Sequence, residues 1–333
     1  MEKIWIICGA FLLELMFGDP RWLPHPVAGI GRCITWLEKG LLRLISRLAV
    51  TGRKVRLLGL LFPLVIAGGT YGLAWGITKL CDGWSPLAGL VSEIVLVWLT
   101  IAPKGLADAG NQIFRALAEG DVEKARRELA MVVGRDTEHL DCDEIVRGGV
   151  ETVAENIVDA VISPLFYALI GGAPLAFAYR AVNTLDAMVG YRNEKYIDLG
   201  WASARLDDLA NWLPARLTVI PMLAAAFCLR LDFRSGWRVV RRDAHLHPSP
   251  NSGIPESLMA GALNIQLGGT NTYQGKVSVR ARLGDPRQPK KRVHLKLAVR
   301  MMWWTTVLFI AGCCEIVLVW KKMFFQSCMI PPF

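Results

Sequence analysis

Acidic and basic side chains recur at a helical spacing in one segment of the sequence. Its members are Asp143, Arg147, Glu151, Glu155 and Asp159, each four residues after the last. On a helix they follow one face, where like charges destabilise each other unless a cation compensates them. Carboxylate oxygens suit Mg²⁺, which proteins bind through one or two carboxylates together with substrate phosphates. The spacing predicts a metal or substrate site, with a solvated acidic helix as the alternative.

A proline-rich segment at 241–256 offers small polar side chains beside arginines. Its three prolines in eight residues exclude a regular helix. A helix starting near Pro255 would add its N-terminal dipole, so we predict a phosphate-binding loop next to Arg242. His245 and His247 are only weak evidence for a metal site. The small residues of the loop are Ser249, Asn251, Ser252 and Gly253.

Two further segments combine polar groups with apolar surroundings. Ionisable residues between 180 and 211 flank apolar sequence, and such groups near a bilayer indicate a functional site unless they only join helices as ion pairs. The residues of interest there are Arg180, Asn183 and Asp186. In the segment 18–27, His25 lies among three prolines, whose fixed φ angles hold neighbouring side chains in place at little entropic cost.

These groups must be carried by membrane helices, because the chain is unusually apolar. Of its 333 residues, 53% are hydrophobic, and the mean hydropathy is +0.35. Soluble domains average roughly 45–50% apolar residues. We therefore predict an all-α, polytopic membrane protein of about five spans. The apolar stretches are about 4–17, 57–78, 84–101, 209–229 and 298–320.

A sixth apolar stretch, 160–178, contains Gly172 and Pro174 and predicts either a broken span or a re-entrant helix. If it spans, the segment 179–208 faces outward; if it is re-entrant, that segment faces the cytoplasm. Between the spans, 104–130 has the periodicity of two short amphipathic helices broken near Gly120. The basic stretch 275–297 is predicted to be an exposed loop.

The distribution of Lys and Arg predicts the orientation. The segment 18–56 carries eight of them and is expected in the cytoplasm, and alternation places 102–159 and 230–297 there too. We predict one membrane domain, 1–333, whose first helix is retained rather than cleaved. The net charge of +9 is explained by loops on anionic membrane lipid, so nucleic acid is not an expected partner. The sequence has no Walker A or G-x-G-x-x-G nucleotide motif.

Five motifs in one order resemble the adenosylcobinamide-phosphate synthases of cobalamin (vitamin B12) biosynthesis. The resemblance runs from about residue 8 to about residue 320, and the tail after Lys322 departs from it. The motifs are Gly18-Asp19-Pro20 with Leu23-Pro24-His25-Pro26-Val27, Val133-Gly134-Arg135-Asp136-Thr137, Glu151-Thr152-Val153-Ala154-Glu155-Asn156 with Asp159, Arg180-Ala181-Val182-Asn183-Thr184-Leu185-Asp186, and Asp243-Ala244 leading to His247-Pro248-Ser249-Pro250-Asn251-Ser252-Gly253.

The resemblance implies a multi-pass ligase of the cell inner membrane with its active site facing the cytoplasm. It would join 1-aminopropan-2-yl phosphate, or the ethanolamine counterpart, to the free propionate carboxylate of adenosylcobyric acid. Forming an amide from a carboxylate requires activation, so ATP and Mg²⁺ are implied, with the corrinoid as a substrate. Enzymes of the later lower-ligand steps are possible partners.

The resemblance also suggests roles for the residues of these motifs. Phosphate charge would be neutralised by arginines, namely Arg135, Arg180 and Arg242. The loop Ser249–Gly253, with Asn183, would contact substrate, and Asp186 or His25 would take the proton from the attacking ammonium. The ligands of Mg²⁺ on the nucleotide phosphates would be Glu151, Glu155 and Asp159.

Two other classes of protein remain as alternatives. A related membrane family is associated with signalling around β-lactamase induction, so a sensor is possible, and a sensor would need neither corrinoid nor ATP. A transporter would also carry polar groups within the membrane, but the paired inverted segments typical of transporters are not found.

Overall fold

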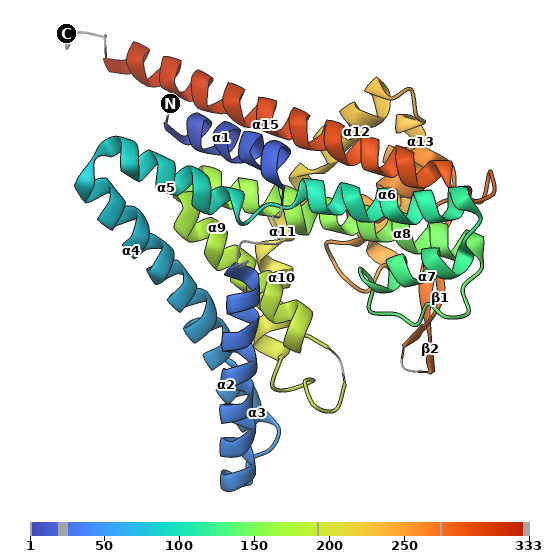
Figure 1. Ribbon diagram of the computed structural model, residues 1–333, viewed down its shortest axis with the longest axis horizontal. Coiled ribbons are helices and arrows are strands. Elements are labelled where there is room, and N and C mark those ends of the chain that lie inside the picture. The colour runs from blue at the N-terminus through green and yellow to red at the C-terminus, as the bar shows by residue number, and fades with distance from the viewer. Residues whose placement is uncertain (1, 19–25, 192, 274, 329–333) are drawn as a thin grey trace. The chain divides into compact units, whose positions relative to one another are not determined.

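The computed structural model describes residues 2–18, 26–191, 193–273 and 275–328. The chain forms two compact units, each assembled from separated segments (Figure 1). Unit 1 contains Met1–Ile101, Ser163–Ala210 and Phe309–Phe333, and unit 2 contains Ala102–Ile162 and Asn211–Leu308. The long helix α15 (Val293–Cys328) contributes residues to both.

The regular structure of unit 1, within its described residues, is helical, and turns join the helices. In its core, Ile34 of one helix and Leu185 of another belong to the same buried cluster as Phe62. Phe62 immediately precedes a π-helical turn at Pro63–Ala67. At Gly59 a Cβ atom would lie 2.2 Å from the carbonyl oxygen of Leu199, so the backbones approach closely there. The helices are α1 (Glu2–Phe17), α2 (Pro26–Leu48), α3 (Arg53–Gly59), α4 (Gly68–Trp84), α5 (Pro86–Trp98), α9 (Ser163–Val189) and α10 (Trp201–Ala210).

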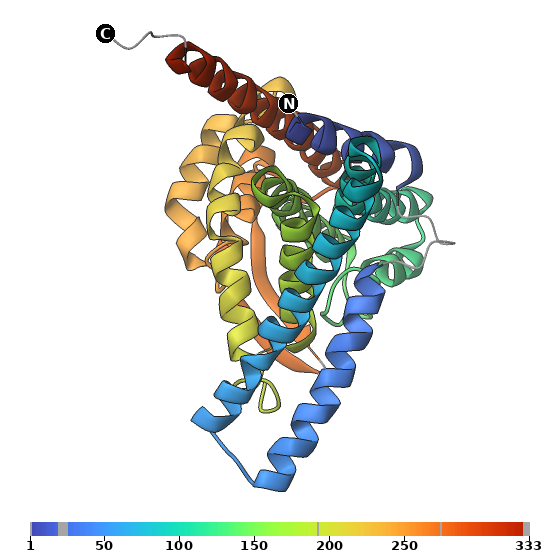
Figure 2. The same ribbon diagram turned by 90° about the vertical axis from the view of Figure 1, so that its left-hand side faces the viewer.

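Helix α1 of unit 1 has a buried carboxylate and a cysteine close to a second cysteine. Glu14 of α1 is fully buried, and its carboxylate accepts a hydrogen bond from the indole N–H of Trp98 at 3.2 Å. Both ribbon views show α1 beside the C-terminal part of α15 (Figures 1 and 2), where the sulfur atoms of Cys8 and Cys314 are 3.8 Å apart.

Helix α9 is broken at the predicted place. Gly172 has φ 69° and ψ −161°, which is not helical, and Pro174 follows in the next half of the helix. The carboxylate of Glu93 accepts the freed backbone N–H of Ala173 at 2.7 Å. The break between two glycines and a proline is thus stabilised by an acidic side chain from α5, as a broken helix in an apolar setting requires.

Unit 2 buries α8 (Cys142–Ile157) and α14 (Gly253–Leu263) most deeply; every residue of α14 is buried. The predicted pair of amphipathic helices is present, because Gly120 (φ 80°) ends the first and the Asp121 carboxylate accepts the N–H of Lys124 at the start of the second. The remaining helices are α6 (Pro103–Glu119), α7 (Val122–Ala130), α11 (Trp212–Leu217), α12 (Val219–Cys228) and α13 (Phe233–Asp243).

The predicted exposed loop at 275–297 is wrong in part. Residues 276–283 form strand β2 (Lys276–Leu283), which pairs antiparallel with β1 (Leu267–Tyr273), and 293–297 begin α15. Gly268 has φ 76°, and a Cβ atom there would lie 2.1 Å from the carbonyl oxygen of Ala281, so the irregular register at this point requires glycine. The fold is otherwise helical, as predicted.

Among the described residues, four helices are long and apolar enough to cross a membrane, and a fifth is possible if Trp201–Leu217 and Val219–Cys228, which meet at 40°, form one span. The protein is therefore a polytopic helical membrane protein. The four are Arg53–Trp84, Pro86–Glu119, Cys142–Val189 and Val293–Val319.

The predicted first span at 4–17 is not among these helices. Helix α1 has 16 residues, which at about 1.5 Å per residue is short for a bilayer. The stretch 160–178 lies within the apolar helix Cys142–Val189 instead. The prediction of one membrane domain with three cytoplasmic segments stays a prediction, because the helices alone do not fix the position of the membrane.

Candidate functional site

Helix α8 carries the acidic stripe into the interior of unit 2. Asp141 caps the helix by accepting the N–H of Glu144 at 2.8 Å. From Ile145 to Ala154 every residue of α8 is buried. Arg147 and Glu151 are therefore charged side chains in a protein interior, where each must be paired.

The carboxylate of Glu151 is paired with two arginines. Arg135 forms an ion pair with one of its oxygens, and Arg147 donates to the other at 3.1 Å. The backbone N–H of Gly268 donates to the same oxygen at 2.8 Å. The side-chain oxygen of Asn271 accepts from Arg135 at 2.5 Å and from Arg147 at 3.0 Å. The hairpin thus completes a network that begins on α8.

This pairing differs from the predicted set of Mg²⁺ ligands. The oxygens of Glu151 already receive two guanidinium groups and a backbone N–H, and the π-helical turn Val158–Ile162 carries Asp159 out of the four-residue register of the stripe. Within the described parts of the chain, no three His, Cys, Asp or Glu side chains are arranged to hold a metal ion. The three carboxylates do not fit a protein-held metal as a set, because arginines compensate the charge of Glu151.

Glu155 connects α8 to the proline-rich loop. The hydroxyl of Ser252 donates to its carboxylate at 2.9 Å. The hydroxyl oxygen of Ser249 accepts the backbone N–H groups of Asn251 at 3.3 Å and Ser252 at 3.2 Å. The loop is a shaped turn, as predicted, but two of the N–H groups expected to hold a phosphate donate within the loop. At Gly253 a Cβ atom would lie 2.3 Å from the carbonyl oxygen of Ala244, so glycine permits close packing there.

A buried histidine and a buried carboxyl lie behind this loop. His247 Nε2 is 3.5 Å from Glu256 Oε1, and the N–H of Ser249 donates to His247 Nδ1 at 3.1 Å. Burial, followed by the charges of Glu151 and Glu155, raises the pKa of Glu256 well above its usual value. Burial likewise lowers the pKa of His247. Both groups therefore favour their neutral forms.

Arg242, in the last turn of α13, is bound by two acidic side chains. Its guanidinium donates to both oxygens of Asp243, at 2.6 and 2.8 Å, and is 2.9 Å from Asp285. Asp243 also accepts the N–H of Gly284 at 2.8 Å. The adjacent Arg242 guanidinium lowers the pKa of Asp243. Two acids thus neutralise the arginine that was predicted to contact phosphate.

The other predicted residues belong to unit 1. Arg180, Asn183 and Asp186 are three residues apart on α9, and Arg180 is within 3.5 Å of the side-chain oxygen of Asn183. Asp186 lies against the end of the helix, because a Cβ atom on Gly190 would be 2.0 Å from its carboxylate oxygen. His25 lies outside the described residues.

Sequence reasoning did not assign site roles to Arg147, Asn271 or Glu256. Glu256 carried a usable signal, since it is the one ionisable residue in the apolar run 253–263. Asn271 carried none, because its partners are far away in the sequence. Its side-chain nitrogen is buried and has no hydrogen-bond partner among the described residues, as is the case for the hydroxyl of Ser257. Such atoms are uncommon in protein interiors.

Comparison with known proteins places the chain in a family. The profile of the family described as "CobD/Cbib protein" matches residues 7–302. A "Cobalamin biosynthesis protein CobD" of Geobacter metallireducens is 49% identical over 92% of this chain and 94% of its own length. A "Cobalamin biosynthesis protein CbiB" of Salmonella paratyphi B is 43% identical over 91% and 94%. A CobD protein of Halalkalibacterium halodurans is 47% identical over 84% and 85%.

No solved structure matches the chain significantly. The family profile covers most of the chain, including the buried network of α8, the loop at 247–253 and the hairpin. The resemblance found in the motifs is thus confirmed at the level of the family. The chain belongs to the CobD/CbiB family of cobalamin biosynthesis proteins.

Proposed function

We propose that the protein is an ATP-dependent ligase of the cell inner membrane. It joins (R)-1-aminopropan-2-yl phosphate, or the ethanolamine counterpart, to the propionate carboxylate of adenosylcobyric acid and gives adenosylcobinamide phosphate. The active site faces the cytoplasm, where ATP is available. Membership of a cobalamin biosynthesis family supports the pathway, and the motifs named in the sequence support the reaction.

One observation carries the proposal most directly. Polar groups from four separated segments of unit 2, up to 136 positions apart in sequence, are hydrogen-bonded to helix α8 or to one another. A protein buries charges at this cost when their positions matter for specificity or chemistry, and a site of phosphoryl and acyl transfer requires fixed charges. The segments contain Arg135, Glu151, Ser252 and Asn271.

The reaction has two steps with balanced atoms. A carboxylate oxygen attacks the terminal phosphoryl group of ATP, and ADP leaves, which gives an acyl phosphate. The substrate ammonium then loses one proton, its nitrogen attacks the acyl carbon, and phosphate departs with the electrons of the broken C–O bond and takes up the second proton released from the nitrogen. Asp186 or His25 is the proposed proton acceptor, and Arg180 with Asn183 is the proposed contact for substrate phosphate.

Arg135 is suited to the developing negative charge because it is already fixed in place. Glu151 and Asn271 hold two of its nitrogens, so no side-chain reorganisation is needed when charge forms nearby. Arg242 and the loop from Ser249 to Gly253 have a supporting role in this scheme, since Asp243 and Asp285 bind the arginine. No step is assigned to a protein-held metal, and Mg²⁺ enters the assay with ATP.

The test is amidation by the purified full chain in lipid nanodiscs. The mixture contains adenosylcobyric acid, aminopropanol phosphate, ATP and Mg²⁺, and mass spectrometry follows adenosylcobinamide phosphate and ADP. We expect product only when all components are present, with one ADP released per amide. Folded protein that binds its substrates but forms no amide would contradict the ligase, as would product formed without ATP.

A further inference from the structure

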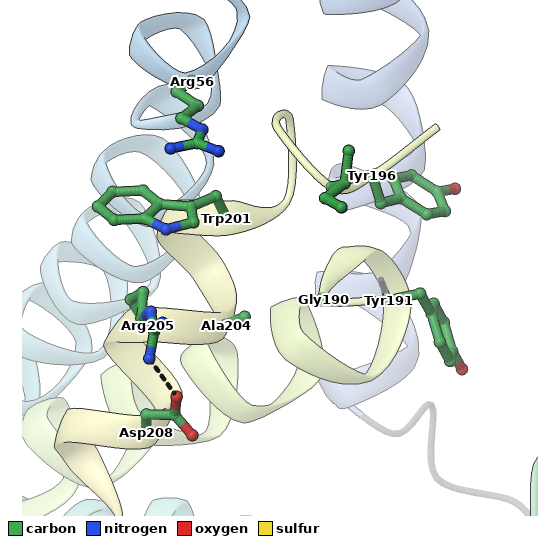
Figure 3. Close-up of a pocket in the computed structure, with 9 residues that line it drawn as sticks. Arg56, Gly190, Tyr191, Tyr196, Trp201, Ala204, Arg205 and Asp208 are labelled. Atoms are coloured by element: carbon green, nitrogen blue, oxygen red, sulfur yellow. Dashed lines mark hydrogen bonds and ion pairs between the residues drawn. The ribbon is translucent and has the colours of Figure 1, made fainter. Parts of the chain in front are cut away.

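Unit 1 contains a pocket that the network in unit 2 does not explain. It has a cavity volume of about 330 Å³ and is partly open to solvent. Figure 3 shows the side chains that line it. Its walls come from the first turn of α3, the segment after α9, and α10. A volume near the lower end of small-molecule pockets, partly open to solvent, suits a ligand that is larger than the pocket and inserts one edge.

The pocket presents one aromatic face. The indole of Trp201 is 41% exposed, and the guanidinium of Arg56 lies 5.8 Å from the centre of its ring. In Figure 3 the rings of Tyr191 and Tyr196 point away from Trp201. Ile197 and Ala204 add apolar surface to the walls. An exposed indole beside aliphatic groups is a surface for a flat, conjugated body.

The charges around the pocket are balanced. Arg56 donates to Asp198 at 2.7 Å, and Arg205 is 3.4 Å from Asp208. Two guanidinium groups and two carboxylates together have no net charge, which disfavours a nucleoside triphosphate with its several negative charges. Donors and acceptors side by side instead suit a ligand rich in amides with a single carboxylate.

The pocket is also tied to a residue of the proposed reaction. Gly190 lines it, and any side chain at this position would collide with the carboxylate of Asp186. Asp186 is therefore one helical turn from the cavity wall. A ligand edge in the pocket would lie near the residue proposed to accept a proton from the amine.

We propose that this pocket binds the edge of the corrinoid substrate. The inference rests on the proposed function, since a corrinoid has a flat conjugated ring whose rim carries carboxamides and, in cobyric acid, one free carboxylate. The ring edge contacts Trp201, the rim amides pair with Asp198 and Asp208, and the carboxylate approaches Arg205. The other two substrates lack this combination, because one is small and the other is highly charged.

Direct binding of adenosylcobyric acid tests this assignment without turnover. The full chain in nanodiscs is mixed with the corrinoid in the absence of ATP, and bound corrinoid is measured by its visible absorbance after ultrafiltration. Loss of one aromatic contact is worth up to about 1.5 kcal/mol, so Trp201→Ala should weaken binding by about tenfold. Ala204→Leu, which fills the cavity and retains the indole, should weaken it as well.

The matched control is Trp237→Ala. Trp237 is 46% exposed and lies 5.9 Å from the guanidinium of Arg241, so it repeats the tryptophan–arginine pair on α13. Binding should be unchanged in this variant. The pocket assignment is overturned if Trp201→Ala and Ala204→Leu bind corrinoid as the wild type does. It is also overturned if these variants lose affinity for a non-hydrolysable ATP analogue and not for the corrinoid.

The binding result and the amidation result are independent. Corrinoid binding that depends on Trp201 in a protein that forms no amide would retain the pocket and refute the ligase. Amide formation with unchanged corrinoid affinity in both variants would retain the ligase and refute the pocket. A third ligand, the analogue of cobyric acid whose carboxylate is converted to an amide, should lose less affinity than the acid when Arg205→Ala is introduced; equal losses would remove Arg205 from the site.

Discussion

The buried network of unit 2 and the ion pairs beside the pocket in unit 1 differ in how far their charges are exposed to solvent. In unit 2 the side chains of Arg135 and Glu151 are each 7% exposed, and they form part of a network with Arg147 and Asn271. In unit 1 the pairs beside the pocket are open to solvent; the side chain of Arg56 is 47% exposed. Removing one partner of a buried pair leaves an uncompensated charge, whereas exposed pairs contribute little. This difference predicts that the same kind of substitution lowers the free energy of unfolding much more at a buried pair than at an exposed pair.

Glu151→Gln should have the largest effect. Two guanidinium groups would remain buried without their shared counter-charge, and we expect a loss of about 3–5 kcal/mol in the free energy of unfolding. Denaturant or thermal unfolding in detergent, with tryptophan fluorescence as the signal, measures it. Glu123→Gln is the matched control because exposed Glu123 pairs with Arg126 at 2.5 Å, and it should cost less than about 1 kcal/mol. Equal losses in the two variants would remove the contrast between buried and exposed ion pairs.

Gly172→Ala tests a place in unit 1 where the partly buried carboxylate of Glu93 binds the backbone. A Cβ atom would lie 2.6 Å from a Glu93 oxygen, and φ 69° disfavours any L side chain. We expect a loss of about 1–3 kcal/mol, measured by thermal unfolding in the same detergent. Gly76→Ala in α4 meets nothing within 4 Å and should be neutral or slightly stabilising. If both variants behave alike, the break in α9 is not held by Glu93.

The helical class and the break in α9 were predictable because they depend on local sequence. Long apolar stretches predict spans, and Gly172 with Pro174 predicts a break wherever it occurs in a helix. The hairpin was missed for a local reason too. Strand β2 exposes Val277 and Val279 between charged residues, so it lacks the buried apolar face that alternation usually indicates.

The partners of the acidic stripe were not predictable in the same way. Arg147 is four residues from Glu151 and was visible as a helical neighbour. Arg135 and Gly268 come from segments 16 and 117 positions away, and nothing in local spacing indicates that they meet at one carboxylate. Sequence reasoning therefore identified the stripe and its need for positive charge, which Arg135 and Arg147 supply at Glu151.

Glu256→Gln tests the buried acidic groups of unit 2 through the pH dependence of stability. The folded-state pKa of Glu256 is raised, so the folded protein binds this proton more tightly than the unfolded chain, and wild-type stability falls as pH rises from about 4.5 towards the folded pKa. Glutamine is neutral throughout, so the variant should lack this decline and gain relative stability with pH, by about 1.4 kcal/mol for each unit of pKa shift. Unfolding at pH 4.5, 6 and 7.5 measures it.

Burial is the main cause of the raised pKa of Glu256, and the charged groups around it add to this effect or oppose it. Glu151 and Glu155 oppose its ionisation, whereas Arg280 and Arg135 favour it, and His247 is the nearest titratable neighbour. A constant stability difference between Glu256→Gln and wild type over this range would mean that folding does not shift the pKa of Glu256.

Asp198→Asn should have the smallest effect. The bond from Arg56 is short, at 2.7 Å, but an exposed pair contributes only about 0–1 kcal/mol, and salt should abolish the difference from wild type. Lys124→Met in unit 2, which removes an exposed pair of 2.9 Å with Glu119, should behave alike. Arg56 lies in the first turn of the apolar helix Arg53–Trp84, so its surroundings depend on where the membrane surface lies. If Asp198→Asn alone lost more than about 2 kcal/mol of unfolding free energy and salt did not change this loss, the pair would lie in a low-dielectric region. It would then behave as a buried pair, and the exposure of its side chains to solvent would not predict its contribution.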